Sequence, residues 1–340
     1  MKKSFYGGVF IITGIALLVL VVLICILSRN PYRTLYFFFF GTFRNIYSFG
    51  YMLNNAIPLM LGGIGVSIAM KTGNLNLGGE GQIYSGAFAA TIIALYLPFL
   101  GILNGFISII AGACIAGAVA AFSGLCKAKW NTNELITTFL LSNALILMVN
   151  YLVNVPFSDP ETNLQSTRKI AEGIRLPLIL PPSNLSAALF IALGLVFIVY
   201  LFLNRTKLGY EFRIAGSNDI FARYGGINTG LNTVIAMFLS GFFYGLAGGM
   251  VVFGSYYATI KEFSAGLGWN GLAVALVAGF NPIALIPASL FFAWIASGAR
   301  IAMQNSDVTF EIASIVQSVI FFLATSMVIR GLFRRKGKQQ

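Results

Sequence analysis

A polar run between two apolar stretches is the first feature of this chain that could do chemistry. Residues 73–82 read Gly-Asn-Leu-Asn-Leu-Gly-Gly-Glu-Gly-Gln and separate the apolar residues 51–70 from 83–100. Each unpaired polar group is costly in hydrocarbon, so non-helical backbone at membrane depth is tolerated only where protein buries it or it lines a wet cavity. The run therefore predicts part of a pathway across a membrane. Its candidate pathway side chains are Asn74, Asn76, Glu80 and Gln82.

Glu80 has two interpretations that do not exclude each other. In the first, Asn76 caps a helix, and the Glu80 carboxylate in its first turn interacts favourably with the helix dipole. In the second, Glu80 is a pathway group that pairs with Gln82, with Asn74 or with backbone amides. An ionisable side chain inside a membrane is a functional candidate by default, so both interpretations are kept.

A second polar block, residues 131–134, opens the apolar stretch 135–154. Its Asn-x-x-Glu form is related to a capping box, which favours a capped helix start over a pathway role for Asn133 and Glu134. Further amides lie inside apolar stretches, where hydrogen bonding between helices and contact with a ligand explain them about equally well. They are Asn54, Asn55, Asn143, Asn150 and Gln317, and Asn133, Glu134 and Asn143 join the pathway or motif candidates. The aromatic side chains of Tyr51, Tyr84, Phe88 and Trp269 could stack on a flat or sugar-like ligand.

The composition is that of a membrane protein without catalytic groups. Hydrophobic residues make up 58% of the 340 residues and charged residues 9%, with a mean hydropathy of +0.84; soluble domains have about 45–50% and about 25%. The absence of histidine removes the commonest metal ligand and the usual general base. Cys25, Cys114 and Cys126 lack a CxxC spacing, and the sequence contains no P-loop. We therefore predict no enzyme activity, no metal and no cofactor.

About ten apolar stretches predict an all-α, polytopic membrane protein with a single transmembrane domain over residues 1–340. They are residues 7–28, 47–70, 81–98, 101–126, 134–154, 185–203, 231–253, 266–280, 283–301 and 311–330. With the N-terminus inside, fourteen of the 22 Lys and Arg residues lie on the inner side and eight on the outer side. This bias predicts cytoplasmic N- and C-termini. It also attributes the net charge of +12 to contact with anionic lipid rather than with nucleic acid.

Three segments outside these stretches are expected to form surfaces. Residues 155–184 are predicted to be an extracytoplasmic loop, residues 204–230 a cytoplasmic loop, and residues 331–340 a basic cytoplasmic tail.

The cytoplasmic loop predicts a helix of about two turns. Ser217 or Asn218 can cap it, and the apolar residues Ile220, Phe221 and Tyr224 then share one face. Gly225-Gly226 ends the helix with a left-handed residue. Two turns are too short to be stable alone, so the spacing fits either a knob that docks into a partner or a plain linker.

The second half of the chain contains a faint echo of the first. Residues 264–271 (SAGLGWNG) precede the eighth stretch much as residues 73–82 precede the third. With ten stretches, two halves of five would have opposite orientation, as in carriers built from inverted repeats. The two blocks share few residues, so a 5+5 inverted pseudo-repeat is a hypothesis.

Four sequence blocks together resemble the permease subunits of bacterial ABC importers, in the branch that serves simple sugars and nucleosides. That branch shares a superfamily with the ribose and branched-chain amino-acid permeases. The blocks are residues 71–82 (KTGNLNLGGEGQ), 133–138 (NELITT), 209–227 with 240–249, and 266–276 with Asn281-Pro282. The resemblance covers about residues 50–330. Gly78-Gly79 departs from it, because a bulkier residue is expected at one of these two positions before Glu80.

The resemblance implies a pump made of several proteins in the bacterial cytoplasmic membrane. This chain would pair with a second, different permease, bind cytoplasmic ATP-binding subunits, and receive solute from an extracytoplasmic binding protein or lipoprotein. ATP-driven closure of the ATPase domains would switch the access of the pathway. The segment that matches residues 209–227 would be the coupling helix. Its implied coupling residues are Glu211, Arg213, Gly216, Ser217, Asn218, Phe221, Tyr224 and Gly225.

The resemblance implies a nucleoside as the first choice of solute, then a simple sugar such as ribose or galactose, with riboflavin as a further option. A secondary carrier driven by protons or sodium stays open from the residues alone, because Glu80 and Glu134 could serve in ion coupling. The two classes differ at the inner loop, because a carrier has no need of a capped, glycine-terminated helix there.

Overall fold

The computed structural model describes residues 2–97 and 101–336, and within these ranges the chain is helical and contains no β-strand. Thirteen α-helices are present there: α1 (Lys2–Leu27), α2 (Pro31–Phe40), α3 (Ile46–Lys71), α4 (Gly79–Tyr96), α5 (Gly101–Trp130), α6 (Glu134–Asn154), α7 (Ala188–Arg205), α8 (Lys207–Ser217), α9 (Asp219–Tyr224), α10 (Thr229–Val251), α11 (Leu267–Val277), α12 (Pro282–Asn305) and α13 (Glu311–Lys336). A π-helical turn, η3 (Val252–Tyr256), follows α10 directly. The predicted all-α class is confirmed.

Each of the ten predicted stretches coincides with a helix, but the number of ten membrane crossings is not confirmed. Among the described residues, six helices are long and apolar enough to cross a membrane, namely α3, α5, α6, α7, α10 and α12. Helix α11 is shorter, and of α1 and α13 only Thr13–Leu27 and Glu311–Leu323 enter this comparison. Helix α11 has only 11 residues, a length of about 16 Å, which is half of a hydrocarbon core of about 30 Å.

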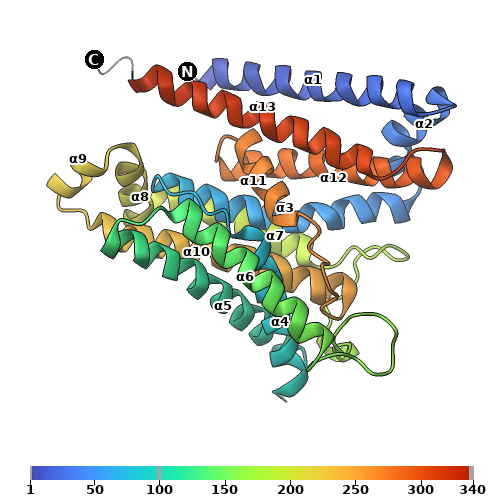
Figure 1. The fold of residues 1–340 in the computed structure, drawn as a ribbon, viewed down its shortest axis with the longest axis horizontal. Coiled ribbons are helices and arrows are strands. Elements are labelled where there is room, and N and C mark those ends of the chain that lie inside the picture. Colours follow the sequence, from blue (N-terminus) through green and yellow to red (C-terminus); the bar gives the residue numbers. More distant parts are fainter. Residues whose placement is uncertain (1, 98–100, 337–340) are drawn as a thin grey trace.

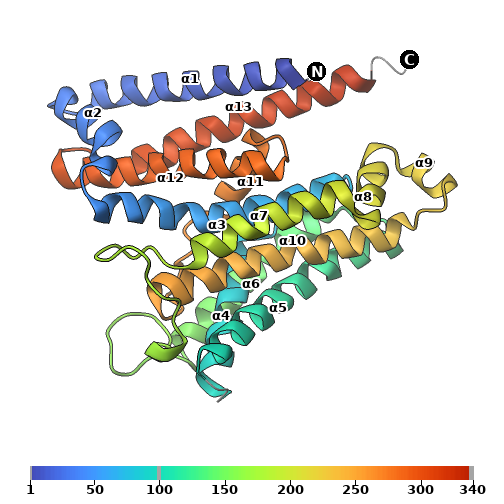
Figure 2. The same cartoon turned by 180° about the vertical axis from the view of Figure 1, so that it is seen from behind.

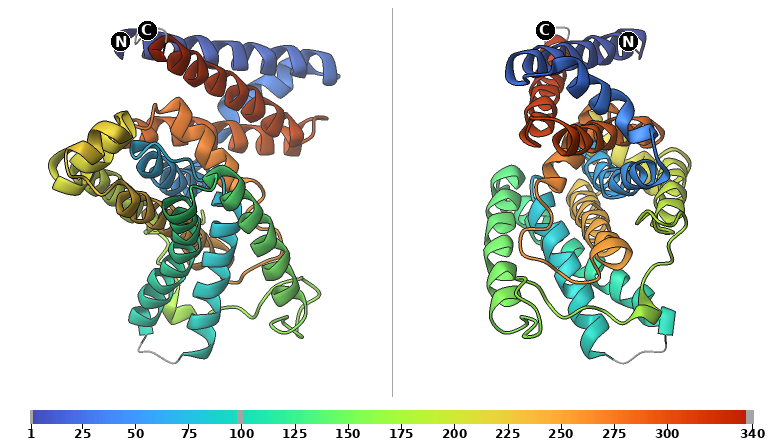
Figure 3. Two further views of the ribbon diagram at one scale, coloured as in Figure 1. Left: turned by 60° about the vertical axis from the view of Figure 1, so that its left-hand side comes forward. Right: turned by 90° about the vertical axis from the view of Figure 1, so that its right-hand side faces the viewer.

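Helix α10 lies at the centre of the molecule, where it packs against α3, α4 and α5 (Figure 1, Figure 3). Glycines let these backbones touch. A Cβ added at Gly245 would lie 2.6 Å from the side chain of Ala116 on α5, and one added at Gly86 on α4 would lie 2.5 Å from the Cα of Gly245. Small residues thus allow the close helix packing that is typical of membrane proteins.

Helices α1, α2, α12 and α13 form a layer on one side of this centre (Figure 1, Figure 2). The turn after α12 is tied to the turn after α1 through Asp307, whose carboxylate accepts from the Ser28 hydroxyl at 2.7 Å and from the Arg29 amide at 2.6 Å. The described N- and C-terminal ends lie toward the same end of the molecule as α8 and α9 (Figure 1). Helix α13 continues to Lys336, into the predicted basic tail, whose residues 337–340 lie outside the described part of the chain.

The long loop 155–184 lies at the opposite end of the molecule from α9 (Figure 2). Its backbone is bound to the segment that follows α10. The Thr167 amide donates to the Thr259 carbonyl at 3.0 Å and the Ile170 amide to the Tyr257 carbonyl at 2.8 Å. This loop is thus an ordered cover rather than a free linker.

Candidate functional site

The predicted polar run forms an extended segment between α3 and α4, and Asn74 holds its first part in place. Gly73 follows the end of α3 with a φ of +76°, a left-handed conformation that glycine adopts without strain. The buried Asn74 amide nitrogen then donates to the Thr72 hydroxyl at 2.7 Å and to the Thr233 hydroxyl of α10 at 3.3 Å. Asn74 therefore ties the segment to α10.

Asn76 and Gln82 bind each other rather than a free cavity. The Asn76 amide nitrogen donates to Gln82 Oε1 at 2.8 Å and to the Ser240 hydroxyl of α10 at 3.0 Å. The Asn76 oxygen accepts from Gln82 Nε2 at 3.2 Å and from the Gly78 amide at 2.9 Å. Asn76 is only 1% exposed and Gln82 only 2%. In this conformation the two amides brace the segment.

Two hydroxyls of α6, which the sequence analysis missed, complete the support of the segment. Thr138 Oγ1 accepts from the Leu77 amide at 3.2 Å, and Ser142 Oγ accepts from the Gly81 amide at 2.8 Å. The two residues are four apart and so share one face of α6. The sequence offered two signals for this support, namely the four-residue spacing and the place of Thr138 at the end of residues 133–138.

The Glu80 carboxylate spans the two halves of the chain. It accepts from the Gly266 amide at 2.9 Å and from the Gly268 amide at 2.7 Å. Gly266 is the N-cap residue of α11, so Glu80 satisfies two of the free N–H groups at the start of that helix. Of the three predicted kinds of partner, which were Gln82, Asn74 and backbone amides, the Glu80 carboxylate binds backbone amides. These amides belong to the block that was predicted to echo residues 73–82.

The expectation that Asn76 caps α4 is wrong. The N-cap of α4 is Gly78, without a side-chain cap, because the Asn76 side chain is engaged by Gln82 and bonds the Gly78 amide instead. A tyrosine of α10 adds a further link across the site. The buried Tyr244 hydroxyl donates to the Gly268 carbonyl at 3.3 Å.

The second block does not form the predicted capping box. Asn133, not Asn131, caps α6, and its side-chain oxygen accepts from the Leu135 amide at 2.9 Å. The adjacent Glu134 carboxylate pairs with Lys127 of α5 at 2.7 Å, so it cannot reach back as a capping-box Glu would. The favoured interpretation, a capped helix start, is therefore confirmed, with Asn133 as the cap.

The remaining predicted amides of α6 lie apart from the segment. The Asn143 side chain is exposed and donates to the Phe139 carbonyl of its own helix at 2.8 Å. Asn150 accepts a 2.6 Å hydrogen bond from the Tyr84 hydroxyl of α4. The structure therefore brings Asn74, Asn76, Glu80 and Gln82 together and leaves Asn143 outside this group.

The cytoplasmic loop contains the predicted short helix, α9. Of the two predicted caps, Asn218 is the one used, and its side-chain oxygen accepts from the Phe221 amide at 3.0 Å. Asp219 lies in the first turn and pairs with Arg223 four residues later at 2.9 Å. This pair and the cap stabilise a helix of only six residues.

The apolar face of α9 is uncovered. Ile220 is 68% exposed, Phe221 64% and Tyr224 90%. The C-cap is Gly225, but its φ is −77°, and the left-handed residue is Gly226, with a φ of +77°. The predicted Gly225-Gly226 stop is therefore confirmed, with Gly226 as its left-handed residue.

Helix α8 connects α9 to the polar segment. A Cβ added at Gly216 would lie 2.9 Å from the Gly73 amide nitrogen and closer still to the Lys71 carbonyl oxygen. The end of α8 therefore lies directly on the turn that leads into residues 74–78.

The other predicted coupling residues of α8 make contacts inside the chain. Glu211 accepts from the Asn232 side chain of α10 at 3.3 Å. Arg213 is partly buried, and the Ser217 hydroxyl donates to the Arg213 carbonyl at 2.7 Å. The Glu211 contact ties α8 to α10, whereas the Ser217 hydroxyl bonds within α8 and the Ser217 side chain is exposed.

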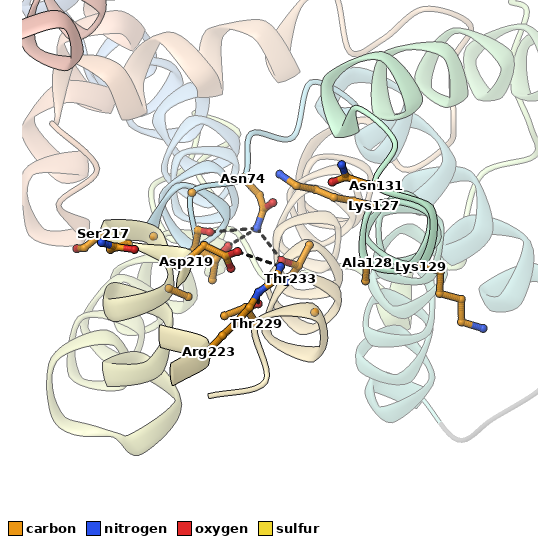
Figure 4. Close-up of a pocket in the computed structure, with 16 residues that line it drawn as sticks. Asn74, Lys127, Ala128, Lys129, Asn131, Ser217, Asp219, Arg223, Thr229 and Thr233 are labelled. Atoms are coloured by element: carbon orange, nitrogen blue, oxygen red, sulfur yellow. Dashed lines mark hydrogen bonds and ion pairs between the residues drawn. The ribbon is translucent and has the colours of Figure 1, made fainter. Parts of the chain in front are cut away.

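A polar cavity of about 690 Å³ separates α9 from the end of α5. Figure 4 shows the Lys127 side chain reaching from α5 toward Asn74, whereas Lys129 points away from it. Asp219 and Arg223 form the opposite wall. Both α9 and the polar segment line this cavity, α9 through Asp219 and Arg223 and the segment through Asn74.

Within the described residues, the chain contains no cluster of three or more His, Cys, Asp or Glu side chains that could hold a metal ion.

A family model described as the branched-chain amino acid transport system permease component matches residues 48–325. The chain belongs to this permease family. No solved structure matches the permease significantly.

Several curated proteins are similar to this permease along most of its length. The probable riboflavin import permease protein RfuC of Treponema pallidum is 31% identical over 96% of this chain and 86% of its own length. The guanosine ABC transporter permease protein NupP of Bacillus subtilis is 30% identical over 87% of both chains. The glucose ABC transporter permease protein TsgB13 of Haloferax volcanii is 29% identical over 94% of this chain and 87% of its own.

Proposed function

We propose that this permease is a membrane subunit of an ATP-driven importer that carries a small polar solute across the cytoplasmic membrane by alternating access. A nucleoside is the first choice of solute, with riboflavin or a simple sugar as alternatives, in line with the names of its relatives. The observation that carries the proposal is α9, a capped helix with an uncovered apolar face that is connected through Gly216 to the polar segment.

The contacts suggest how energy from outside the chain reaches the pathway. A cytoplasmic ATP-binding subunit that grips Phe221 and Tyr224 would move α9 and α8 together. Gly216 would pass that movement to the turn at Gly73, and Glu80 would pass it on to α11. The cavity between α9 and α5 provides space for this movement.

A second, different permease is the proposed partner within the membrane. Bacillus subtilis has two guanosine ABC transporter permease proteins, NupP and NupQ, and this chain is similar to both. The same holds for the nucleoside ABC transporter permease proteins NupB and NupC of Lactococcus lactis. An extracytoplasmic binding protein or lipoprotein would deliver solute near the ordered loop 155–184. In this proposal α1, α4 and α13 join the six long helices as passages, α11 forms the tenth together with the chain that leads into it, and both termini lie in the cytoplasm.

An ion-coupled carrier is the alternative, and the contacts of its two candidate coupling groups count against it. Glu80 is engaged by two backbone amides, and Glu134 is paired with Lys127. Neither carboxylate is free to exchange an ion without breaking these contacts.

The test is the substitution Phe221→Asp in vesicles that contain the assembled importer. A charge on the apolar face should prevent the ATPase from binding, because docking would bury that charge without a partner. We expect loss of ATP-dependent uptake and of ATPase co-purification, with normal insertion into the membrane. Phe221→Leu keeps the face apolar and should retain both activities. Unchanged co-purification of Phe221→Asp would contradict the proposed coupling role.

A further inference from the structure

A second cavity, of about 320 Å³, lies between α11 and α13. Trp269 and Asn270 line it from α11, and Ser314, Gln317, Ser318 and Phe321 line it from α13. Its volume is in the range of small-molecule sites, which are typically about 300–1,000 Å³ with a few polar groups among apolar and aromatic ones. Neither the polar segment nor α9 contributes to it.

The polar groups of this cavity have unused hydrogen-bonding capacity. Within the described part of the chain, no hydrogen bond is formed by the Trp269 indole N–H or by the Asn270 side-chain amide. Gln317 is 9% exposed and uses only its amide nitrogen, which donates to the Phe292 carbonyl at 3.4 Å. The Ser318 hydroxyl already donates to the Ser314 carbonyl at 2.8 Å. An indole N–H and amide groups on two apolar helices are costly to leave unpaired in lipid, so the indole and the two amides have capacity for a partner that the chain does not supply.

The backbone that leads into α11 is unusual in a way that is typical of binding sites. Glu262, Ala265 and Gly266 have φ angles of 57°, 40° and 86°. Left-handed non-glycine residues are uncommon and cluster where function requires a fixed geometry. Because Glu80 clamps the amides of Gly266 and Gly268, the wall that presents Trp269 and Asn270 is held in place.

We propose that this cavity binds the transported solute, and that it selects an uncharged planar heterocycle with hydrogen-bond donors and acceptors along its edge, such as a nucleobase or an isoalloxazine ring. The Trp269 indole is 40% exposed and offers a face on which such a ring can stack. Asn270 and Gln317 each offer an amide, a group that can both donate and accept. The residues that line the cavity include no charged side chain, so an anionic solute finds no counter-charge there. The inference rests on the proposed transport function and adds to it the place where the solute binds and a physical reason for preferring a planar ring over a sugar.

Labelling of cysteines placed at two neighbouring phenylalanine positions tests solute binding in the cavity of the assembled importer. Phe321 lines it, whereas Phe322 points to a different hollow and is 73% exposed. In a background with Cys25, Cys114 and Cys126 replaced by alanine, Phe321→Cys should react with a water-soluble methanethiosulfonate. Guanosine or riboflavin should slow that reaction, and glucose should not. Labelling of Phe322→Cys should respond to none of the three.

Each result of the labelling decides the proposal. Protection by guanosine identifies a nucleobase site and protection by riboflavin a flavin site, and either supports the planar heterocycle. Equal protection by glucose overturns it. An unreactive Phe321→Cys also overturns it, because the cavity is then filled by a helix of the partner permease, for which hydrogen bonding between helices would explain the amides.

Uptake kinetics give an independent measurement. Trp269→Leu and Gln317→Leu should each raise the KM for the heterocycle about tenfold, the effect of losing one well-placed contact. The maximal rate should be unchanged, and Trp269→Phe, which keeps an aromatic face, should restore most of the affinity. ATP-driven uptake with an unaltered KM in both leucine variants would refute solute binding in this cavity and leave the proposed function standing. If the wild-type importer shows no ATP-driven uptake, the proposed function fails, and the labelling still decides the cavity.

Discussion

The Glu80 carboxylate illustrates how a charge can be kept among apolar helices without a basic partner. Its two oxygens accept from the Gly266 and Gly268 amides, at the positive end of α11. A helix N-terminus is a suitable site for an anion because its first N–H groups have no partner inside the helix. Glu80 lies in the first turn of α4, as the first interpretation expects, but the backbone amides that it binds belong to α11 rather than to its own helix.

Replacing Glu80 with Gln should weaken this contact without changing which solute is carried. The Gln side chain keeps one acceptor oxygen and turns an NH₂ group toward a backbone N–H, so one donor loses its partner. We expect a loss of stability of about 0.5–2 kcal/mol, the range for a helix cap, measured by thermal unfolding in detergent. Glu172→Gln, at an exposed ion pair of the outer loop, should change stability little. Altered solute selectivity with unaltered stability would indicate that Glu80 contacts solute directly.

Gly268 allows this contact because a side chain has no room there. A Cβ on Gly268 would lie 2.6 Å from the Gly79 carbonyl carbon, and still closer to the Glu80 amide nitrogen. Gly268→Ala should therefore destabilise the permease by about 1–3 kcal/mol, as overpacking typically does. The matched control is Gly194→Ala on α7, where a Cβ would meet nothing within 4 Å and helix propensity favours alanine. Equal unfolding temperatures for the two variants would contradict the close approach.

Residue types in the sequence identified the polar segment but not the partners of its side chains. Asn76 and Gln82 bind each other and Ser240, and Glu80 binds amides 186 and 188 residues away. Such pairings depend on how α4, α10 and α11 pack, which periodicity does not encode. Thr138 and Ser142 were missed because hydroxyls are common in apolar helices, where most bond their own backbone.

At the scale of the elements, α9 is the part that depends most on local sequence. Six residues cannot form a stable helix alone, so α9 depends on the Asn218 cap, and its uncovered apolar face is the surface available for the proposed docking. Cap, first-turn acid and apolar face were all readable because they lie within a few residues of one another. The contact of Gly216 with Gly73 was not readable, because it joins segments far apart in the sequence.

Removing the cap should weaken docking more than it weakens the fold. Asn218→Ala loses the hydrogen bond to the Phe221 amide, at a cost of about 0.5–2 kcal/mol to α9. We expect reduced ATPase co-purification with little change in the unfolding temperature, because α9 contributes little to the core. Asn228→Ala removes an equivalent cap from the long helix α10 and should leave co-purification intact. Equal losses in both variants would point to general destabilisation instead.

The helices themselves were well predicted, because long apolar stretches have few alternatives. The exceptions are instructive. Helix α11 was expected to extend over residues 266–280, but it ends at Val277, and left-handed residues at Gly279 and Phe280 turn the chain toward α12. The start of α4 is set by Gly78 and not by Asn76. The end of α11 is closed locally, by the Gly279 and Phe280 amides that donate to the Leu276 and Ala275 carbonyls. The start of α4, in contrast, depends on contacts of the polar segment with α6 and α10.

For the whole molecule, the proposed source of energy lies in another protein. The purified permease, placed alone in vesicles with a proton or sodium gradient, should accumulate no solute. Adding the second permease, the ATP-binding subunits, the binding protein and ATP should start uptake. Radiolabelled guanosine and riboflavin measure both conditions. Accumulation by the single chain would support an ion-coupled carrier instead.

The glycine contacts of α10 with α4 and α5 have a mechanical consequence. Backbones that touch cannot slide or part by small side-chain adjustments, because no soft layer lies between them. In the proposed transport cycle we therefore expect a passage to open along the outer boundary of this group of helices and not through its middle. We expect the group to move as one body, so a chimera that exchanges α3, α4, α5 and α10 all together should keep its shape, whereas one that exchanges a single member should not.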